Sequence, residues 1–417
     1  MATHEGTLGA GGRAAPARAS SRVGHSAMLV GVVVAALVLL GLVMILSASS
    51  VSSFATYGSS FLFFNKQLVW AAVGLVGFVA AARLDYHRLR GAGYVALPVV
   101  VLLLAAVLVP GVGVTAGGSS RWIGVGPFTL QPSELAKLAL ILFAADVFAR
   151  KKESTFRELG HTLVPLVPAL GMLAALVMLQ PDLGTTLLIG GIGIGMLFVA
   201  GAPLRHIVPV TAVGAGAALV AAFGESYRRD RILAFLDPWA DPFNTGYQTI
   251  QSLIAIGSGG WFGVGLGASR QKWSYVPNAH TDFIYAIFGE ETGVVGTLVV
   301  LGMFVLLAYL GVRAARNAPD RFGMLLAAGI TTWVSLQAIV NMGAVTASLP
   351  ITGVPLPLVS FGGSSLVVTL VAMGILTNVA SQEGRPAPEP REGAFEALAR
   401  RRRERRTALR RARSRRA

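Results

Sequence analysis

Long uncharged apolar stretches constrain this chain more than any other feature of its sequence. The first runs from residue 27 to residue 46 without a charge, and comparable stretches recur as far as residue 379. A helix of about 20 apolar residues crosses a bilayer core of ~30 Å, so each stretch is a candidate membrane span. Charged residues make up only 13% of the 417 residues, whereas roughly 25% is usual in soluble domains. A water-soluble enzyme is therefore excluded, and the sequence predicts an integral membrane protein.

Ten membrane-spanning helices are predicted, so the expected fold class is an all-α polytopic membrane protein. The segments cover residues 27–46, 68–82, 91–110, 134–149, 162–180, 184–200, 207–223, 283–310, 322–346 and 362–379. Ten spans put both termini on the same side of the membrane, and Lys and Arg are concentrated in the segments on that side. By the positive-inside rule, both termini are expected in the cytoplasm.

Three parts of the chain follow from this assignment. Residues 1–26 are expected to form a disordered cytoplasmic N-terminus, residues 27–380 the membrane domain, and residues 381–417 a flexible cytoplasmic tail. The tail starts with prolines and mixed charges, which is typical of a linker, and it ends with eleven arginines between Arg400 and Arg416. We expect the tail to lie against anionic lipids of the inner leaflet or to dock on an acidic cytoplasmic protein. No nucleic-acid partner is expected.

The segment 224–282 is a long outer stretch between the seventh and eighth predicted spans. Long loops in compact proteins are usually functional. Within it, apolar residues recur at helical spacing beside polar ones, at Tyr247, Ile250, Leu253 and Ile254. This pattern predicts a short amphipathic helix lying at the membrane surface.

Ionisable residues in or beside the spans are candidates for a site, because charges are costly in a membrane. Glu134 and Lys137 are three residues apart and therefore share one face of the fourth predicted helix. They form either a structural ion pair or a polar wall of an outward-open cavity in which Lys137 meets a phosphate, and the two alternatives are compatible. Arg121 lies on the preceding outer loop, where a phosphate headgroup would arrive.

Asp282 stands where the long outer loop enters the eighth predicted span. Asp282 or Thr281 could cap that helix by accepting hydrogen bonds from its free amides, and Asp282 could instead act as a base. His280 is either a ligand or base, or a structural hydrogen-bonding residue. Glu290 and Glu291 lie about two turns into the span, and we expect at least one of them to pack against polar partners.

Several chemistries are excluded by what the sequence lacks. The chain has no cysteine, which removes disulfides, thiol nucleophiles and cysteine-bound metals. It also has no Walker A pattern and no His-x-x-x-His pair, so no nucleotide or metal site is predicted. An enzyme with this sequence would use a carboxylate, cationic groups and a substrate that arrives from the membrane.

The ordered motifs around these residues resemble a known family, the SEDS proteins, which are the FtsW/RodA cell-wall polymerases of bacteria. Nine segments carry the resemblance: 121–124, 131–137, 180–185, 231–238, 246–248, 279–284, 289–291, 355–357 and 360–365. The strongest are Ala279-His280-Thr281-Asp282-Phe283-Ile284 and Ser360-Phe361-Gly362-Gly363-Ser364-Ser365. The resemblance extends from about residue 28 to residue 380.

This resemblance implies a peptidoglycan glycosyltransferase that polymerises lipid II into β-1,4-linked glycan strands at the outer face of the cytoplasmic membrane and releases undecaprenyl pyrophosphate. The catalytic aspartate of the family matches Asp282, and its cavity residues match Glu134 and Lys137. Lys137 and Arg121 would stabilise the pyrophosphate. Three further residues are candidates for support: His280, Glu290 and Ser364. No cofactor is implied, although a divalent cation could assist.

The resemblance also implies partners and a location. These are a class B penicillin-binding protein with transpeptidase activity, other division proteins, and a multi-pass place in the cytoplasmic membrane at the division septum. Segments 246–248 and 351–355 and the long tail look more like FtsW than like RodA. The alternatives are an elongation polymerase of the RodA type, a lipid II flippase, and a scaffold for the transpeptidase. A flippase needs polar groups along its inner half as well, whereas the charges here cluster at the outer end, which favours an enzyme.

Overall fold

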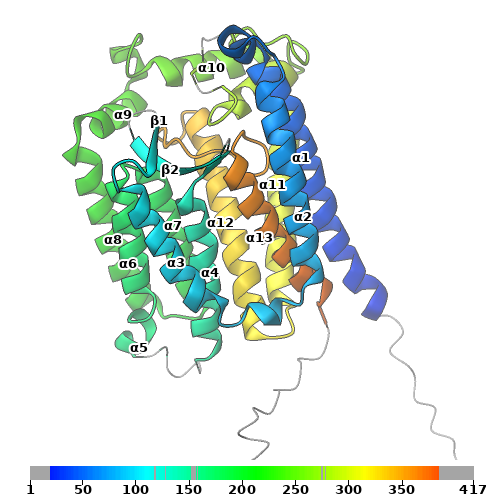
Figure 1. The fold of residues 1–417 in the computed structure, drawn as a ribbon, viewed down its shortest axis with the longest axis vertical. Coiled ribbons are helices and arrows are strands. Elements are labelled where there is room, and N and C mark those ends of the chain that lie inside the picture. Colours follow the sequence, from blue (N-terminus) through cyan, green and yellow to red (C-terminus); the bar gives the residue numbers. More distant parts are fainter. Residues whose placement is uncertain are drawn as a thin grey trace, which may run out of the picture.

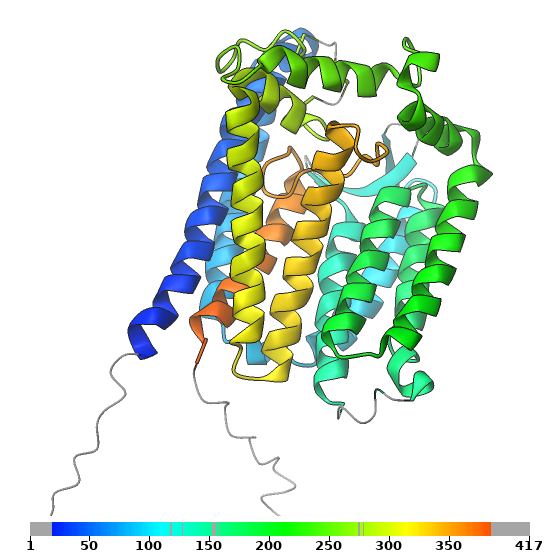
Figure 2. The ribbon, with the colours of Figure 1, turned by 180° about the vertical axis from the view of Figure 1, so that it is seen from behind.

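The computed structural model describes residues 19–116, 119–126, 128–151, 156, 158–273, 276–277 and 279–384. Most of them lie in long helices that run side by side, with a small sheet and a layer of short helices at one end (Figures 1 and 2). The long helices are α1 (Ala19–Tyr57), α2 (Leu62–Arg83), α3 (Ala92–Val107), α4 (Pro132–Ala149), α6 (Val167–Leu179), α7 (Leu183–Val199), α8 (Leu204–Gly224), α11 (Ile284–Arg316), α12 (Arg321–Val345) and α13 (Gly363–Ser381). Two short elements, η1 (Tyr86–Leu89) and α5 (Leu159–Leu163), lie in the connections.

Each predicted span overlaps one of the long helices. Among the described residues, six helices are long and apolar enough to cross a membrane, namely α1, α2, α8, α11, α12 and α13. Three more, α3, α6 and α7, are apolar but shorter. Helix α4 carries Glu134, Lys137 and Asp146, all buried inside the bundle. The mainly helical, integral-membrane fold is therefore confirmed, while the number of ten crossings and their orientation stay predictions.

One predicted boundary is wrong and one predicted span is interrupted, each for a local reason. Helix α1 continues to Tyr57, well past residue 46, and its small polar residues stay helical by bonding to their own backbone, as Ser49 Oγ does to the Ile45 carbonyl at 2.6 Å. Helix α11 is interrupted at Gly293, which has φ 71° and ψ −168°. The amide freed at Val294 donates instead to the Gly260 carbonyl at 2.9 Å, so the break is satisfied from outside the helix.

The all-α prediction is wrong in one outer segment, which forms a three-stranded antiparallel sheet in the order β1-β2-β3. The strands are β1 (Gly113–Ala116), β2 (Ser119–Val125) and β3 (Phe128–Leu130). Gly113 pairs with Ile123, and Gly124 pairs with Thr129. Trp122 and Ile123 in β2 suit a pleated surface. Because β2 also contains Arg121, the sheet holds that residue at the end of the bundle where Asp282 lies.

Residues 225–273 form a layer, here called the roof, across the end of the bundle (Figures 1 and 2). The roof contains α9 (Ser226–Leu236), η3 (Pro238–Ala240) and α10 (Tyr247–Gly259). The predicted amphipathic helix is confirmed as α10. It packs on α11 with Ile250 and Ala255 buried, whereas Leu253 and Ile254 are 39% and 44% exposed, and its place at the membrane surface stays a prediction. Ser252 Oγ donates to the Val345 carbonyl at 2.7 Å and ties α10 to α12.

Glycines allow α2 and α13 to approach closely. A Cβ at Gly74 would lie 2.5 Å from Cδ1 of Leu370, and a Cβ at Gly374 would lie 2.4 Å from the Phe78 carbonyl oxygen. Small residues at such positions are the usual means of close helix packing in membranes. This contact fixes α13, whose first turn reaches the candidate site.

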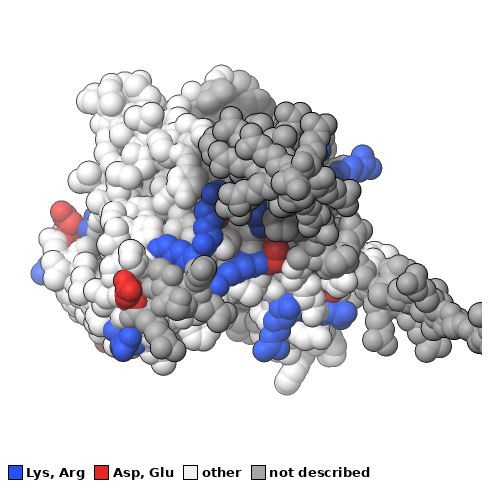
Figure 3. Space-filling view, turned by 90° about the horizontal axis from the view of Figure 1, so that it is seen from below, with Lys and Arg blue, Asp and Glu red and all other residues white. Residues whose placement is uncertain are grey.

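Helix α1 begins and helix α13 ends at the end of the bundle opposite the roof (Figures 1 and 2). Lys and Arg side chains lie on this face (Figure 3), to which Arg83, Arg150 and Arg316 belong as the last residues or caps of their helices. This distribution is the one on which the predicted cytoplasmic orientation depends. Helix α1 already begins at Ala19, within the segment expected to be disordered. The predicted Arg-rich tail lies outside the described residues.

Candidate functional site

Asp282 lies at the roof end of the bundle, directly before α11. The N-cap residue of α11 is Phe283, so the capping alternative for Asp282 is not supported. Asn341 Nδ2, on α12, donates to the Asp282 carbonyl and to the Val354 carbonyl, both at 2.8 Å. The Asp282 backbone is thus tied to the segment that precedes α13. In that segment, a Cβ on Gly353 would lie 3.6 Å from Asp282 Oδ2, so Gly353 leaves space beside the carboxylate.

Charges of both signs surround the Asp282 carboxylate. Burial raises the pKa of Asp282 from the ordinary 3.8 to about 6, against the opposing effects of Arg231 in α9 and Arg121 in β2. Asp182, which precedes α7, raises this pKa further by repulsion. A carboxylate with a pKa near 6 is ionised at pH 7 and still basic enough to accept a proton. These are the properties of a general base.

Arg121 is held by the turn between α6 and α7. Its Nε donates to the Gln180 carbonyl at 3.2 Å, and its Nη2 donates to the Pro181 carbonyl at 2.6 Å. Its Nη1 lies 3.6 Å from Asp182 Oδ2, and 18% of the Arg121 side chain is exposed. Asp182 itself caps α7 by accepting a hydrogen bond from the Thr185 amide at 3.0 Å. Arg121 is therefore fixed in direction and still reachable from outside the bundle.

Glu134 and Lys137 form a buried ion pair. Lys137 Nζ lies 2.8 Å from Glu134 Oε1, and the two side chains are 1% and 3% exposed, Lys137 first. Lys137 Nζ also donates to Gln337 Oε1 at 2.8 Å, and it lies 4.9 Å from the ring centroid of Trp333. Ser365 Oγ donates to Glu134 Oε2 at 2.8 Å. The geometry supports the ion-pair alternative, and a phosphate could reach Lys137 only if these partners moved.

His280 lies among aromatic rings. Its ring centroid is 4.8 Å from that of Phe63 and 5.6 Å from that of Phe361. Burial lowers the pKa of His280 to about 4, so the ring is neutral at pH 7. The His280 carbonyl accepts a hydrogen bond from the Phe361 amide at 2.9 Å. These contacts support a structural role close to Asp282.

The other two supporting candidates hold neighbouring segments in place. Glu290 Oε1 accepts a hydrogen bond from the Arg270 amide at 3.0 Å, which attaches the roof to α11. Glu291 Oε1 accepts one from Ser47 Oγ at 2.5 Å. The expectation that at least one of these glutamates has polar partners is thus confirmed. Ser364 Oγ accepts a hydrogen bond from the Gln131 amide at 3.1 Å. The serine that contacts Glu134 is the next residue, Ser365.

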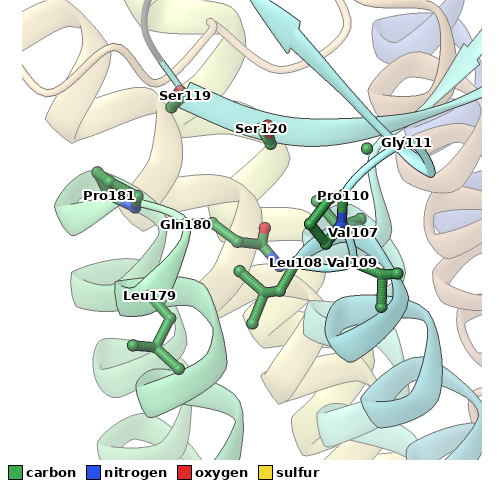
Figure 4. A pocket seen from close by; sticks show the side chains of 11 residues that line it. Val107, Leu108, Val109, Pro110, Gly111, Ser119, Ser120, Leu179, Gln180 and Pro181 are labelled. Carbon is green, nitrogen blue, oxygen red and sulfur yellow. The ribbon is translucent and has the colours of Figure 1, made fainter.

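A cavity of about 360 Å³ opens beside the turn that holds Arg121 (Figure 4). It lies between the ends of α3 and α6 and strand β2, and its lining includes Val107, Pro110, Ser119, Ser120, Leu179 and Gln180. Its volume falls at the lower end of the range for small-molecule sites, roughly 300–1,000 Å³. All the lining residues that the structure describes are uncharged. Arg121, which bonds to the wall of this cavity, is thus the nearby cation for an anionic ligand.

Sequence reasoning missed several residues that the fold brings to this site. Asp182 and Arg231 are not among the predicted site residues, although both lie in segments that carry the family resemblance. That resemblance could have found them. Gln337 and Asn341 lie in an apolar span outside every quoted motif. Their spacing of four residues, which places both on one face of α12, was the remaining signal.

The hypothesis of an assisting cation gains no support from side-chain placement. Within the described part of the chain, no group of three or more His, Asp or Glu residues is arranged to hold a metal ion. The divalent cation therefore stays a hypothesis for the assay.

Comparison with known proteins agrees with this arrangement. The profile of a cell cycle protein family, that of FtsW, RodA and SpoVE, matches residues 27–385. A probable peptidoglycan glycosyltransferase FtsW of Geobacter metallireducens is 45% identical over 348 residues, which are 83% of this chain and 92% of that protein. Stage V sporulation protein E of Bacillus subtilis is 41% identical over 357 residues, covering 84% of this chain and 96% of that protein.

Solved structures show the same fold. A chain from a peptidoglycan synthase complex that coordinates polymerization and crosslinking superposes with a TM-score of 0.70 at 32% identity, covering 85% of this chain and 98% of that one. The rod shape determining protein RodA of Thermus thermophilus superposes with a TM-score of 0.63 at 29% identity, covering 85% and 97% of the two chains.

Proposed function

This chain belongs to the cell cycle protein family of FtsW, RodA and SpoVE, and from that premise we propose that it is a peptidoglycan glycosyltransferase that polymerises lipid II at the outer face of the cytoplasmic membrane. The observation that carries this proposal is the burial of the Asp282 carboxylate and its raised pKa. Its carboxylate is partly buried at the roof end of the bundle, and its pKa of about 6 is set by burial and by Arg231, Asp182 and Arg121.

In this reaction Asp282 acts as the general base. The 4-hydroxyl of the acceptor N-acetylglucosamine attacks C1 of the donor N-acetylmuramic acid and transfers its proton to the Asp282 carboxylate. The new C1–O bond forms as the bond to pyrophosphate breaks, so an α linkage becomes a β linkage in one inverting displacement. One carboxylate is sufficient for such a step, because no covalent enzyme intermediate has to form. A positioned general base contributes about 10²–10⁴-fold to the rate.

The leaving group is undecaprenyl pyrophosphate, which gains negative charge in the transition state. Arg121 is the best placed cation for it, since the turn at Gln180 and Pro181 fixes its guanidinium while 18% of the side chain stays exposed. Arg231 is the second candidate, because its charge acts on Asp282. Fixed cations around a developing anion lower the barrier without reorganisation.

Lys137 and Glu134 support the site from inside the bundle. Their pair joins α4 to Gln337 of α12 and Ser365 of α13, and Gln337 Nε2 in turn donates to the Pro355 carbonyl at 3.0 Å. The pair therefore positions the segment before α13, which also contains the glycine beside Asp282. A direct contact of Lys137 with pyrophosphate requires a second conformation of this network.

A septal role and a transpeptidase partner complete the proposal. The relatives named FtsW and the similarity to a chain of a peptidoglycan synthase complex support a protein that polymerises glycan strands at the division septum beside a class B penicillin-binding protein. The alternatives of a flippase and a scaffold make different predictions for the same experiment, whereas an elongation polymerase of the RodA type would also form glycan strands.

The test is polymerisation of fluorescent lipid II by the purified protein, with and without the penicillin-binding protein and with and without Mg²⁺ or Mn²⁺. We expect glycan strands of increasing length on a gel, and none with Asp282→Asn. Transfer of labelled lipid II between leaflets of vesicles without any polymer would support the flippase instead. A folded protein that shows neither activity alone or with its partner would leave only the scaffold.

A further inference from the structure

The roof exposes large aromatic side chains that its own fold does not need. Trp239 is 67% exposed, Phe243 85%, Trp261 70% and Phe262 83%. Such side chains bury large apolar areas when they are covered. Exposed apolar groups gathered in one segment usually mark a contact with a protein, a ligand or a membrane.

The first aromatic pair continues the lipid-facing side of α8. That helix is a candidate span with only 11% of its apolar window buried, and Val213 and Val220 on it are 74% and 75% exposed. The chain passes from α8 directly into α9, where Leu236 is 71% exposed. Trp239 and Phe243 follow at once. The apolar surface of α8 therefore extends along the chain into this edge of the roof.

The second pair continues the lipid-facing side of α11. Backbone hydrogen bonds join Val294 to the Gly260 carbonyl at 2.9 Å and Val295 to the Trp261 carbonyl at 3.2 Å. Below this junction, α11 exposes apolar side chains, among them Leu298 at 57%. Trp261 and Phe262 therefore sit where the exposed apolar face of a membrane-spanning helix ends. That level is the membrane–water interface, where tryptophan is enriched because its ring is apolar and its N–H is polar.

The two pairs lie beyond opposite ends of α10. That helix crosses the end of the bundle between η3 and the junction with α11 (Figures 1 and 2). Its middle is held by protein contacts, through Ser252 to α12 and through buried Ala255. The roof is thus fixed to the bundle at its centre and carries aromatic groups at both edges.

We infer that these two aromatic pairs, Trp239 with Phe243 and Trp261 with Phe262, insert into the outer leaflet and anchor the roof to the lipid surface on both sides of the candidate site. The partner is the interfacial layer of the bilayer itself. It fits because each pair is continuous with a lipid-facing helix. The consequence is positional, since Arg231, whose charge acts on Asp282, lies in α9 between α8 and the first pair, so the anchor fixes the helix that carries Arg231.

The experiment uses the absence of cysteine from the natural chain. Single cysteines are introduced as Phe243→Cys and Phe262→Cys, with Arg270→Cys as a control at an exposed, charged residue of the roof. Each variant is spin-labelled in nanodiscs of phosphatidylethanolamine and phosphatidylglycerol, and collisions with oxygen and with an aqueous nickel chelate are measured. We expect oxygen to dominate at 243 and 262 and nickel to dominate at 270. Nickel dominance at all three positions would overturn the inference.

A second measurement keeps the native packing. Trp239→Phe and Trp261→Phe preserve an apolar ring and remove one emitter each, so each should reduce the quenching of tryptophan fluorescence by brominated lipids. Unchanged quenching in both variants would contradict the anchor. Labels that become shielded only when a penicillin-binding protein is added would assign the surface to a protein instead. Neither measurement uses lipid II, so the outcome is independent of the proposed activity.

Discussion

Replacing Asp282 by asparagine is expected to abolish polymerisation while the protein stays folded. Asparagine has the same shape, and the hydrogen bond from Asn341 goes to the backbone carbonyl of residue 282, so the local structure is kept. The amide cannot accept the proton of the attacking hydroxyl. Loss of a general base costs about 10²–10⁴-fold in rate, which corresponds to about 3–5 kcal/mol of activation free energy.

The same change is expected to leave the free energy of unfolding unchanged or to increase it. The pKa of Asp282 is raised on folding from 3.8 to about 6, so the ionised carboxylate disfavours the folded state above pH 6. This penalty disappears as the pH falls through 6 toward 3.8. A shift of about two units corresponds to up to about 3 kcal/mol at pH 7, and partial exposure of the carboxylate reduces that value. Asparagine removes the penalty at every pH.

The assay compares lipid II polymerisation and thermal unfolding for the wild type, for Asp282→Asn and for Asp237→Asn. Asp237 is an exposed carboxylate of the same outer segment, and it caps η3 through the Trp239 amide at 3.1 Å. Asparagine can keep that cap, so the control should stay active. Wild-type activity should fall as the pH is lowered through about 6. Polymerisation by Asp282→Asn at a rate near that of the wild type, or a wild-type rate that is flat down to pH 5, would refute the assignment of the base.

Three further predictions concern Arg231, the buried ion pair and the C-terminal tail. Arg231→Gln should move the acid limb of the pH–rate profile to higher pH, because Arg231 lowers the pKa of the base, whereas Arg229→Gln, exposed on the same helix, should leave the limb in place. Glu134→Gln and Lys137→Met should each destabilise the protein by about 3–5 kcal/mol, because each leaves one buried charge without its partner. The double variant should unfold at a higher temperature than either single variant. If a stable double variant still forms polymer, a phosphate contact of Lys137 is excluded. Removal of residues 386–417 should leave polymerisation in detergent intact, and an inactive but folded truncation would show that the tail takes part in catalysis.

The mainly helical membrane fold could be predicted because its signal is local. An apolar stretch must form its own backbone hydrogen bonds in lipid, so length and hydropathy alone indicate a helix. The same logic explains the errors. Helix α1 passes residue 46 because serines can bond within a helix, and the break at Gly293 depends on amides satisfied by the roof. Hydropathy does not report either effect.

The candidate site also has parts that the sequence could predict and parts that it could not. Charged residues beside spans are rare enough to be noticed, so Asp282, Glu134, Lys137 and Arg121 could be named from the sequence, and the spacing of three residues indicated the ion pair. The sheet that carries Arg121 was missed, because short strands are determined by pairing with distant residues and not by their own pattern.

What the sequence by itself determined is which segments are apolar enough to become helices and which charges lie near their ends. Only the tertiary structure decided which of those charges share an environment. Arg231, Asp182 and Asp282 are far apart along the chain, and their mutual effect on one pKa arises because the roof, α7 and α11 meet at one end of the bundle. Lys137 similarly meets Gln337, which lies on a different helix 200 residues later in the chain. Electrostatic interaction depends on distance and burial in space, and neither quantity is written in the order of the residues.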